Sequence, residues 1–195
     1  MPDGTAPGGL IGPNALTQLL PLLEQAGGAN LRDDMLIRAG IVTLPDMTGL
    51  IDEAPVARLH QVMRAEMPTL APSLAWEAGE RTAEYILANR IPQGVQWMLR
   101  ALPDRIAGPI LARAIAQNAW TFTGSGAFRI LSMHPLRFAI HDNPVVRGEF
   151  SNHPLCHWHT AVFEHLFRTL VDDRLRARET ACCAMGAEAC VFEIA

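Results

Sequence analysis

The segment CCAMGAEACVF, residues 182–192, decides the fold of this chain. Alternating apolar residues on both sides of Met185-Gly186 predict a hairpin, with strands over residues 177–183 and 189–194. Such a hairpin brings Cys182 and Cys190 together across its two arms. The remaining cysteine outside this segment, Cys156, precedes a predicted helix whose start can reach the hairpin from the side.

These cysteines, with one glutamate, have the composition of a metal site. Three thiolates and one carboxylate would complete a tetrahedral shell, and the predicted ligands are Cys156, Glu179, Cys182 and Cys190. Thiolates favour a soft or borderline ion, so zinc is the first prediction and iron the second. A shell filled by protein leaves no open position, which indicates a structural zinc. Two alternatives stay open: buried cysteines that pack as small apolar residues, or a redox disulfide between Cys182 and Cys190.

The same segment resembles the C-terminal signature of the 4-vinyl-reductase-type domain. The pattern is Cys-x-Ala-x-Gly-x-x-x-Cys-x-Phe, and residues 182–192 match it at every fixed position. In phenol-responsive bacterial regulators this domain carries a structural zinc held by three cysteines and a glutamate. The resemblance therefore implies zinc at the four ligands named above. It also implies an α+β ligand-binding domain, related to haem domains that sense nitric oxide and to a vesicle-tethering subunit.

A freestanding domain of this size most resembles the members of this family that serve bacteriochlorophyll synthesis. The family name implies reduction of a vinyl group on divinyl protochlorophyllide, but a hydride has to come from a nicotinamide or flavin. The sequence has no GxGxxG after a strand and no Gly-rich phosphate loop. The resemblance thus favours an accessory or carrier protein that binds a Mg-porphyrin or protochlorophyllide and passes it to enzymes such as the Mg-chelatase.

Two other functions and one assembly remain as expectations from the resemblance. The first alternative function is a vinyl reductase with an unidentified electron donor, and the second is a small-molecule sensor or interaction module. The expected assembly is a homodimer, because members of the family often dimerise.

A flat macrocycle with carboxylates needs an apolar slot with aromatic walls, arginines for the carboxylates and an imidazole for magnesium. The predicted strands offer Arg129 and Arg137 for the carboxylates, and a predicted turn offers His134 as axial ligand. The alternative for each is ordinary: core aromatics, solvent-exposed arginines and a turn histidine. The complete set of candidate pocket residues is Trp97, Trp120, Phe122, Phe128, Arg129, His134, Arg137 and Phe138.

Hydrophobic periodicity predicts the α+β class, with N-terminal helices packed on a small antiparallel sheet. Residues 1–12, rich in Gly and Pro, are expected to form a flexible arm, and residues 13–195 a single domain. Three strands in a meander are expected over residues 119–144, with a turn at 124–126. The predicted helices run from residue 13 to Gly27-Gly28 and over residues 30–39, 52–67, 72–89, 95–102, 103–117 and 155–173.

Composition excludes some classes of function. The chain has 195 residues, a formal net charge of −4 and arginine as its only basic residue apart from histidine, which argues against nonspecific nucleic-acid binding. No apolar run approaches the roughly 20 residues that cross a bilayer, so no transmembrane segment is expected. The N-terminus lacks the basic start of a signal peptide. A cytoplasmic location with reduced thiols is therefore expected.

Overall fold

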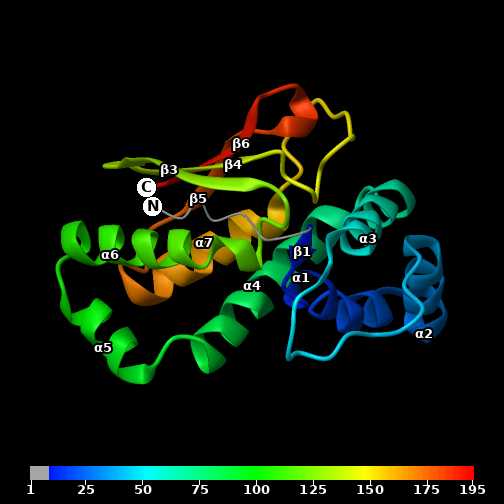
Figure 1. Cartoon of the computed structure of the whole chain (residues 1–195), viewed down its shortest axis with the longest axis horizontal. Helices are drawn as coiled ribbons and strands as arrows, with labels where there is room; N and C mark the ends of the chain where they lie inside the picture. Colours follow the sequence, from blue (N-terminus) through cyan, green and yellow to red (C-terminus); the bar gives the residue numbers. More distant parts are fainter. Residues whose placement is uncertain (1–8) are drawn as a thin grey trace.

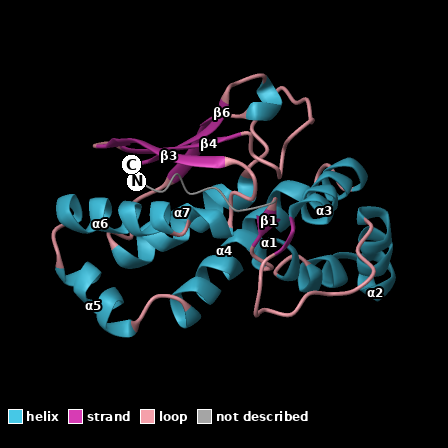
Figure 2. Ribbon diagram, in the orientation of Figure 1, coloured by secondary structure: helices cyan, strands magenta, loops and turns pink. Residues whose placement is uncertain are grey.

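The computed structural model describes residues 9–195, so residues 1–8 of the expected arm lie outside the described residues. The α+β class predicted from the sequence is confirmed (Figure 2). No helix in the described range is long and apolar enough to cross a membrane. In chain order the elements are β1 (Leu10–Ile11), α1 (Asn14–Thr17), α2 (Leu20–Ala39), β2 (Ile51–Asp52), α3 (Glu53–Glu66), α4 (Ala71–Asn89), α5 (Gln93–Ala101), α6 (Asp104–Gln117), η1 (Ala119–Thr121), β3 (Ala127–Met133), β4 (Leu136–His141), α7 (His157–Leu170), β5 (Ala177–Ala181), η2 (Cys183–Met185) and β6 (Ala189–Ile194).

A four-stranded antiparallel sheet of order β3-β4-β6-β5 forms one layer, and helices α6 and α7 cover one of its faces (Figure 1). Alternation along the strands turns aromatic side chains toward α7. Phe138 of β4 pairs in register with Phe192 of β6. Both rings pack edge-on against Phe163 of α7, at centroid distances of 5.4 and 5.2 Å. This aromatic core fixes α7 under the sheet.

The first of the three expected strands is wrong. Residues 119–121 form the 3-10 helix η1, because local hydrogen bonds replace a ladder: Phe122 N and Thr123 N both donate to Ala119 O, at 3.0 and 2.9 Å. The Thr121 carbonyl instead accepts from Gly12 N at 2.7 Å. The β-propensity of this segment is overridden by tertiary context.

Helix boundaries follow the sequence signals closely. Asp52 caps α3, accepting a hydrogen bond from Ala54 N at 2.9 Å. The predicted stop at Gly27-Gly28 appears as a break inside α2, where Gly28 adopts a φ of +80°. The expected arm is shorter than predicted, because Leu10–Ile11 already pair with β2.

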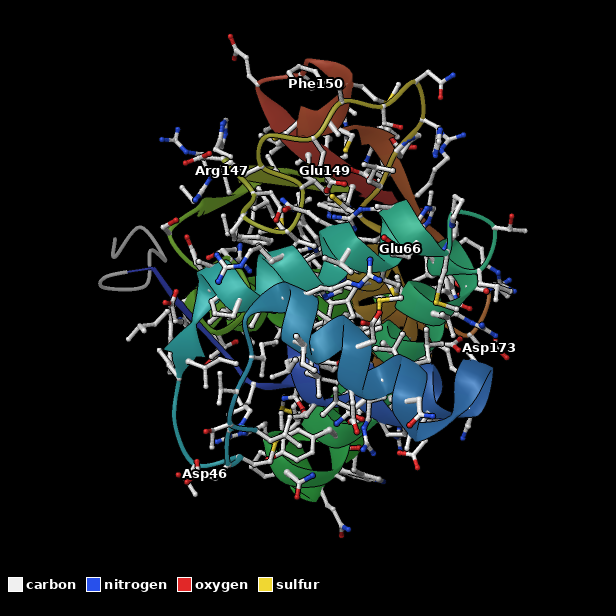
Figure 3. All side chains as sticks on the ribbon, turned by 90° about the vertical axis from the view of Figure 1, so that its right-hand side faces the viewer. Asp46, Glu66, Arg147, Glu149, Phe150 and Asp173 are labelled. Carbon is white, nitrogen blue, oxygen red and sulfur yellow. The ribbon has the colours of Figure 1, made fainter. Side chains whose placement is uncertain are left out.

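The loop between β4 and α7 is tied to α3. Arg147 lies 3.1 Å from Glu53, and Glu149 forms an ion pair with Arg64. Figure 3 shows Arg147 and Glu149 on this loop, above α3. Because the loop ends at Cys156, these ion pairs help to position the start of α7 against the sheet.

Candidate metal centre and ligand cavity

The structure brings the four predicted metal ligands together. Their ligand atoms all lie within 4.8 Å of one another, and all four residues are buried. Cys156 Sγ lies 3.3 Å from Cys190 Sγ, which lies 4.0 Å from Cys182 Sγ. The turn that returns the chain from Cys182 to Cys190 needs Gly186, whose φ is +86°. All four cysteines of the chain are free thiols in this arrangement.

The geometry fits a tetrahedral thiolate-rich cation. Ligands about 2.3 Å from zinc lie about 3.8 Å apart at tetrahedral angles, which falls between the two sulfur distances above. Glu179 Oε2 accepts a hydrogen bond from Cys156 N at 2.8 Å. The other oxygen, Oε1, is buried and has no hydrogen-bond partner among residues 9–195. A buried oxygen without a donor is costly, so a cation at this position would satisfy it.

The protonation of the cluster also depends on a cation. Burial, and next the charge of Cys182, raise the pKa of Glu179 to about 8. Burial likewise raises the pKa of the Cys156 thiol well above its ordinary value. The pKa of Cys182 is lowered, first by hydrogen bonding with Cys156 and then with Cys190. Without a cation the cluster therefore favours a single thiolate, and binding a cation would release protons from the other groups.

Two further hydrogen-bond donors reach the sulfur atoms. Asn143 Nδ2 donates to Cys156 Sγ at 3.3 Å, and Cys183 N donates to Cys190 Sγ at 3.4 Å. Asn143 is fully buried and its Oδ1 accepts from Val145 N at 3.1 Å. Sequence reasoning missed Asn143, although the Asp-Asn-Pro turn around it signals an amide that bonds its own backbone. The Cys183 thiol itself lies outside the cluster, as its adjacency to Cys182 predicts.

A cavity of about 440 Å³ lies between α4, α6, α7 and η1. Its walls are mainly apolar and include the rings of Trp120, Phe122 and Trp158. The Trp158 indole donates to Thr82 Oγ1 at 3.2 Å, which fixes this wall. Arg90 is the one charged residue among the described residues that line the cavity. Its guanidinium lies 6.0 Å from the Tyr85 ring and forms no ion pair with a carboxylate of residues 9–195.

Only Trp120 and Phe122 of the eight candidate pocket residues line this cavity. Phe128 and Phe138 belong to the aromatic core instead, with ring centroids 5.3 Å apart. They point inward as predicted, but the strands place them between the sheet and α7 rather than at an opening. The sequence could not distinguish a core aromatic from a cavity aromatic, because both follow the same alternation.

The other four candidates lie outside the cavity for different reasons. Trp97 points away from the protein on α5 and is 74% exposed. Arg129 is exposed on β3, and Arg137 of β4 lies 3.7 Å from Glu193 on the neighbouring strand. His134 occupies the turn between β3 and β4. The cavity residues that sequence reasoning missed are Arg90, Trp158 and Phe163; the helical spacing of 158, 162 and 166 is the signal that one face of α7 forms a wall.

Comparison with known proteins gives the following matches. The family model of the 4-vinyl-reductase-type domain matches residues 136–195. The bacteriochlorophyll synthase 23 kDa chain of Cereibacter sphaeroides is 52% identical over 184 residues, which cover 94% of this chain and 89% of the relative. The protein of the same name from Rhodobacter capsulatus is 40% identical over 182 residues, covering 93% and 85%. An H-NOX protein from S. oneidensis, in the Fe(II)NO ligation state, is similar in fold alone, with a TM-score of 0.58, 9% identity and coverage of 95% and 98%.

Proposed function

The chain belongs to the 4-vinyl-reductase-type domain family and, within it, to the bacteriochlorophyll synthase 23 kDa chains, and we propose that it serves bacteriochlorophyll biosynthesis as a tetrapyrrole-binding accessory or carrier protein. The proposed ligands are a Mg-porphyrin or divinyl protochlorophyllide. The names of the relatives support the pathway, and the cavity supports the binding role. Delivery to an enzyme such as the Mg-chelatase stays a prediction from the family resemblance.

The observation that carries the binding role is an apolar, aromatic-lined cavity with one unpaired arginine. Its volume of about 440 Å³ lies within the roughly 300–1,000 Å³ typical of small-molecule sites. Rings such as Trp120, Phe122 and Trp158 provide faces for stacking against a flat macrocycle. Arg90, which has no carboxylate partner among the described residues, would pair with a carboxylate of the tetrapyrrole. An uncharged apolar ligand would leave that arginine without a role.

We further propose that the four clustered ligands hold a structural zinc. Cys182 and Cys190 flank the turn of the β5–β6 hairpin, whereas Cys156 immediately precedes α7, so the ion would link the hairpin to this helix. Helix α7 supplies Trp158, Val162 and Leu166 to the cavity wall. When bound, the zinc supplies folding energy rather than catalysis, because protein atoms fill all four positions.

The binding role is tested by titrating the purified full chain with Mg-protoporphyrin and with protochlorophyllide. The expected result is a shifted Soret band that saturates, and Arg90→Gln should weaken binding about tenfold by removing one charged hydrogen bond. Arg129→Gln is the matched control, since Arg129 is exposed on β3 and forms no ion pair with described residues.

Other outcomes of the same experiment would favour the alternatives. An unshifted Soret band with both pigments would refute the binding role. Conversion of the divinyl substrate by the pure protein with NADPH would favour the vinyl reductase. A nonporphyrin ligand that copurifies and fills the cavity would favour the sensor.

A further inference from the structure

Helix α5 turns its apolar side away from the protein. Leu99 is its one buried residue among the nine of the helix. Val95, Trp97 and Met98 are exposed, and Trp97 is the most exposed of the three. A surface helix of a globular protein normally directs its apolar stripe toward the core. Here the packed side holds Leu99 and the half-buried Gln96, whereas the larger apolar surface has no partner in the described structure.

Helix α6 extends this exposed apolar surface. Ile106 and Ile110 lie one turn apart and are 50% and 36% exposed. Figure 1 shows α5 and the start of α6 at the lower left corner of the molecule, far from α3 and from the loop that follows β4. We call the exposed residues Val95, Trp97, Met98, Ile106 and Ile110 the α5–α6 face.

Unpaired positive charge surrounds the α5–α6 face. Nine of the 16 arginines form ion pairs with carboxylates. Residues 90–113 hold one acidic residue, Asp104, in a chain whose net charge is −4. Four exposed arginines of the same range form no ion pair with any carboxylate of the described chain: Arg90, Arg100, Arg105 and Arg113. The local surface is therefore basic although the protein is acidic.

We propose that the α5–α6 face binds an anionic lipid surface. An exposed tryptophan on an amphipathic helix, with arginines at its edges, is the composition of helices that lie in the interface of a bilayer. Anionic headgroups would supply the carboxylate or phosphate partners that Arg100 and Arg105 lack among the described residues. A second copy of this chain is a poorer partner for the face, because the same arginines would meet across a twofold axis and repel.

The test is cosedimentation of the full chain with vesicles of phosphatidylcholine alone, or of phosphatidylcholine and phosphatidylglycerol in equal amounts. Binding is expected only to the anionic vesicles and should weaken as salt is added. Trp97→Ser should weaken binding about tenfold by removing apolar area. Arg105→Gln should weaken it about fivefold, the typical contribution of one basic residue near an anionic membrane.

Matched controls separate this surface from general hydrophobicity and charge. Phe150→Ser removes an exposed ring of 96% exposure on the loop after β4, and Arg129→Gln removes an unpaired arginine from β3. Both should bind vesicles as the wild type does. Equal loss in the controls, or no binding to anionic vesicles, would refute the proposal. If Trp97→Ser instead converts a dimer to a monomer and vesicles stay unbound, the face is an interface between copies.

The pigment titration provides an independent readout for the same variants. Neither Trp97 nor Arg105 lines the cavity, so tetrapyrrole binding in solution should be unchanged in both. Loss of pigment binding together with vesicle binding would place the face within the ligand site and refute a separate lipid surface. A wild type that binds anionic vesicles but neither pigment would refute the proposed function and leave the lipid proposal standing.

Discussion

Replacing one predicted zinc ligand, by Cys190→Ser, should lower both metal content and stability. Cys190 is fully buried at the start of β6, and its sulfur is the one that lies closest to both other cluster sulfurs. A structural zinc contributes about 10–16 kcal/mol in small zinc domains, so loss of one of four ligands should cost about 3 kcal/mol. For a protein of this size that cost corresponds to a decrease in Tm of about 10 °C.

The assay combines elemental analysis with thermal unfolding followed by circular dichroism. The wild type should contain about one zinc per chain and lose its high Tm when a chelator is added, whereas Cys190→Ser should have the low Tm with or without chelator. Cys183→Ser is the matched control, because Cys183 is partly exposed and lies outside the cluster. A wild type without metal whose Tm ignores the chelator would refute the zinc proposal.

Two predictions concern stability elsewhere in the fold. Burial lowers the pKa of His60 from 6.5 to about 3, so the unfolded chain takes up the proton first: the contribution of this group to the free energy of unfolding is complete above pH 6.5 and should fall by about 1.4 kcal/mol per pH unit as the pH decreases toward 3. Urea unfolding at pH 7 and pH 5 should show a smaller decrease for His60→Gln, and an equal decrease would contradict the assigned cause. Gly79→Ala should cost about 2 kcal/mol, because a Cβ would collide with the Trp158 carbonyl oxygen where α4 crosses α7, whereas Gly94→Ala meets no atom within 4 Å and should be neutral or stabilising. Equal Tm values for the two alanine variants would show that α4 and α7 can separate without cost.

The metal cluster could be predicted from the sequence because its signals are local. Cys182 and Cys190 are joined by a short turn with an obligatory left-handed glycine, Gly186, so the hairpin follows from the sequence pattern. The start of α7 at Cys156 required only the recognition of a helix boundary. The family resemblance carried by residues 182–192 is confirmed by the family match and by the relatives.

The ligand cavity could not be predicted because its walls are defined by tertiary packing. Phe122 and Phe128 are both aromatic and near β3, yet one reaches the cavity and the other the core. Arg90 carries no sequence signal, since its distinguishing property is the absence of a carboxylate partner among described residues. Trp97 was expected to face inward because amphipathic helices normally do so, and the structure turns it outward.

The most direct test of the tetrapyrrole proposal is to fill the cavity from its exposed rim. Ala114 of α6 lines the cavity yet is exposed, so Ala114→Trp should occupy the opening without disturbing the core, and Ala88→Trp places the same ring on the exposed side of α4 away from the cavity. Titration with Mg-protoporphyrin should give a saturating Soret shift for the wild type and Ala88→Trp, and none for Ala114→Trp at an unchanged Tm. Equal pigment affinity in all three proteins would contradict binding in this cavity.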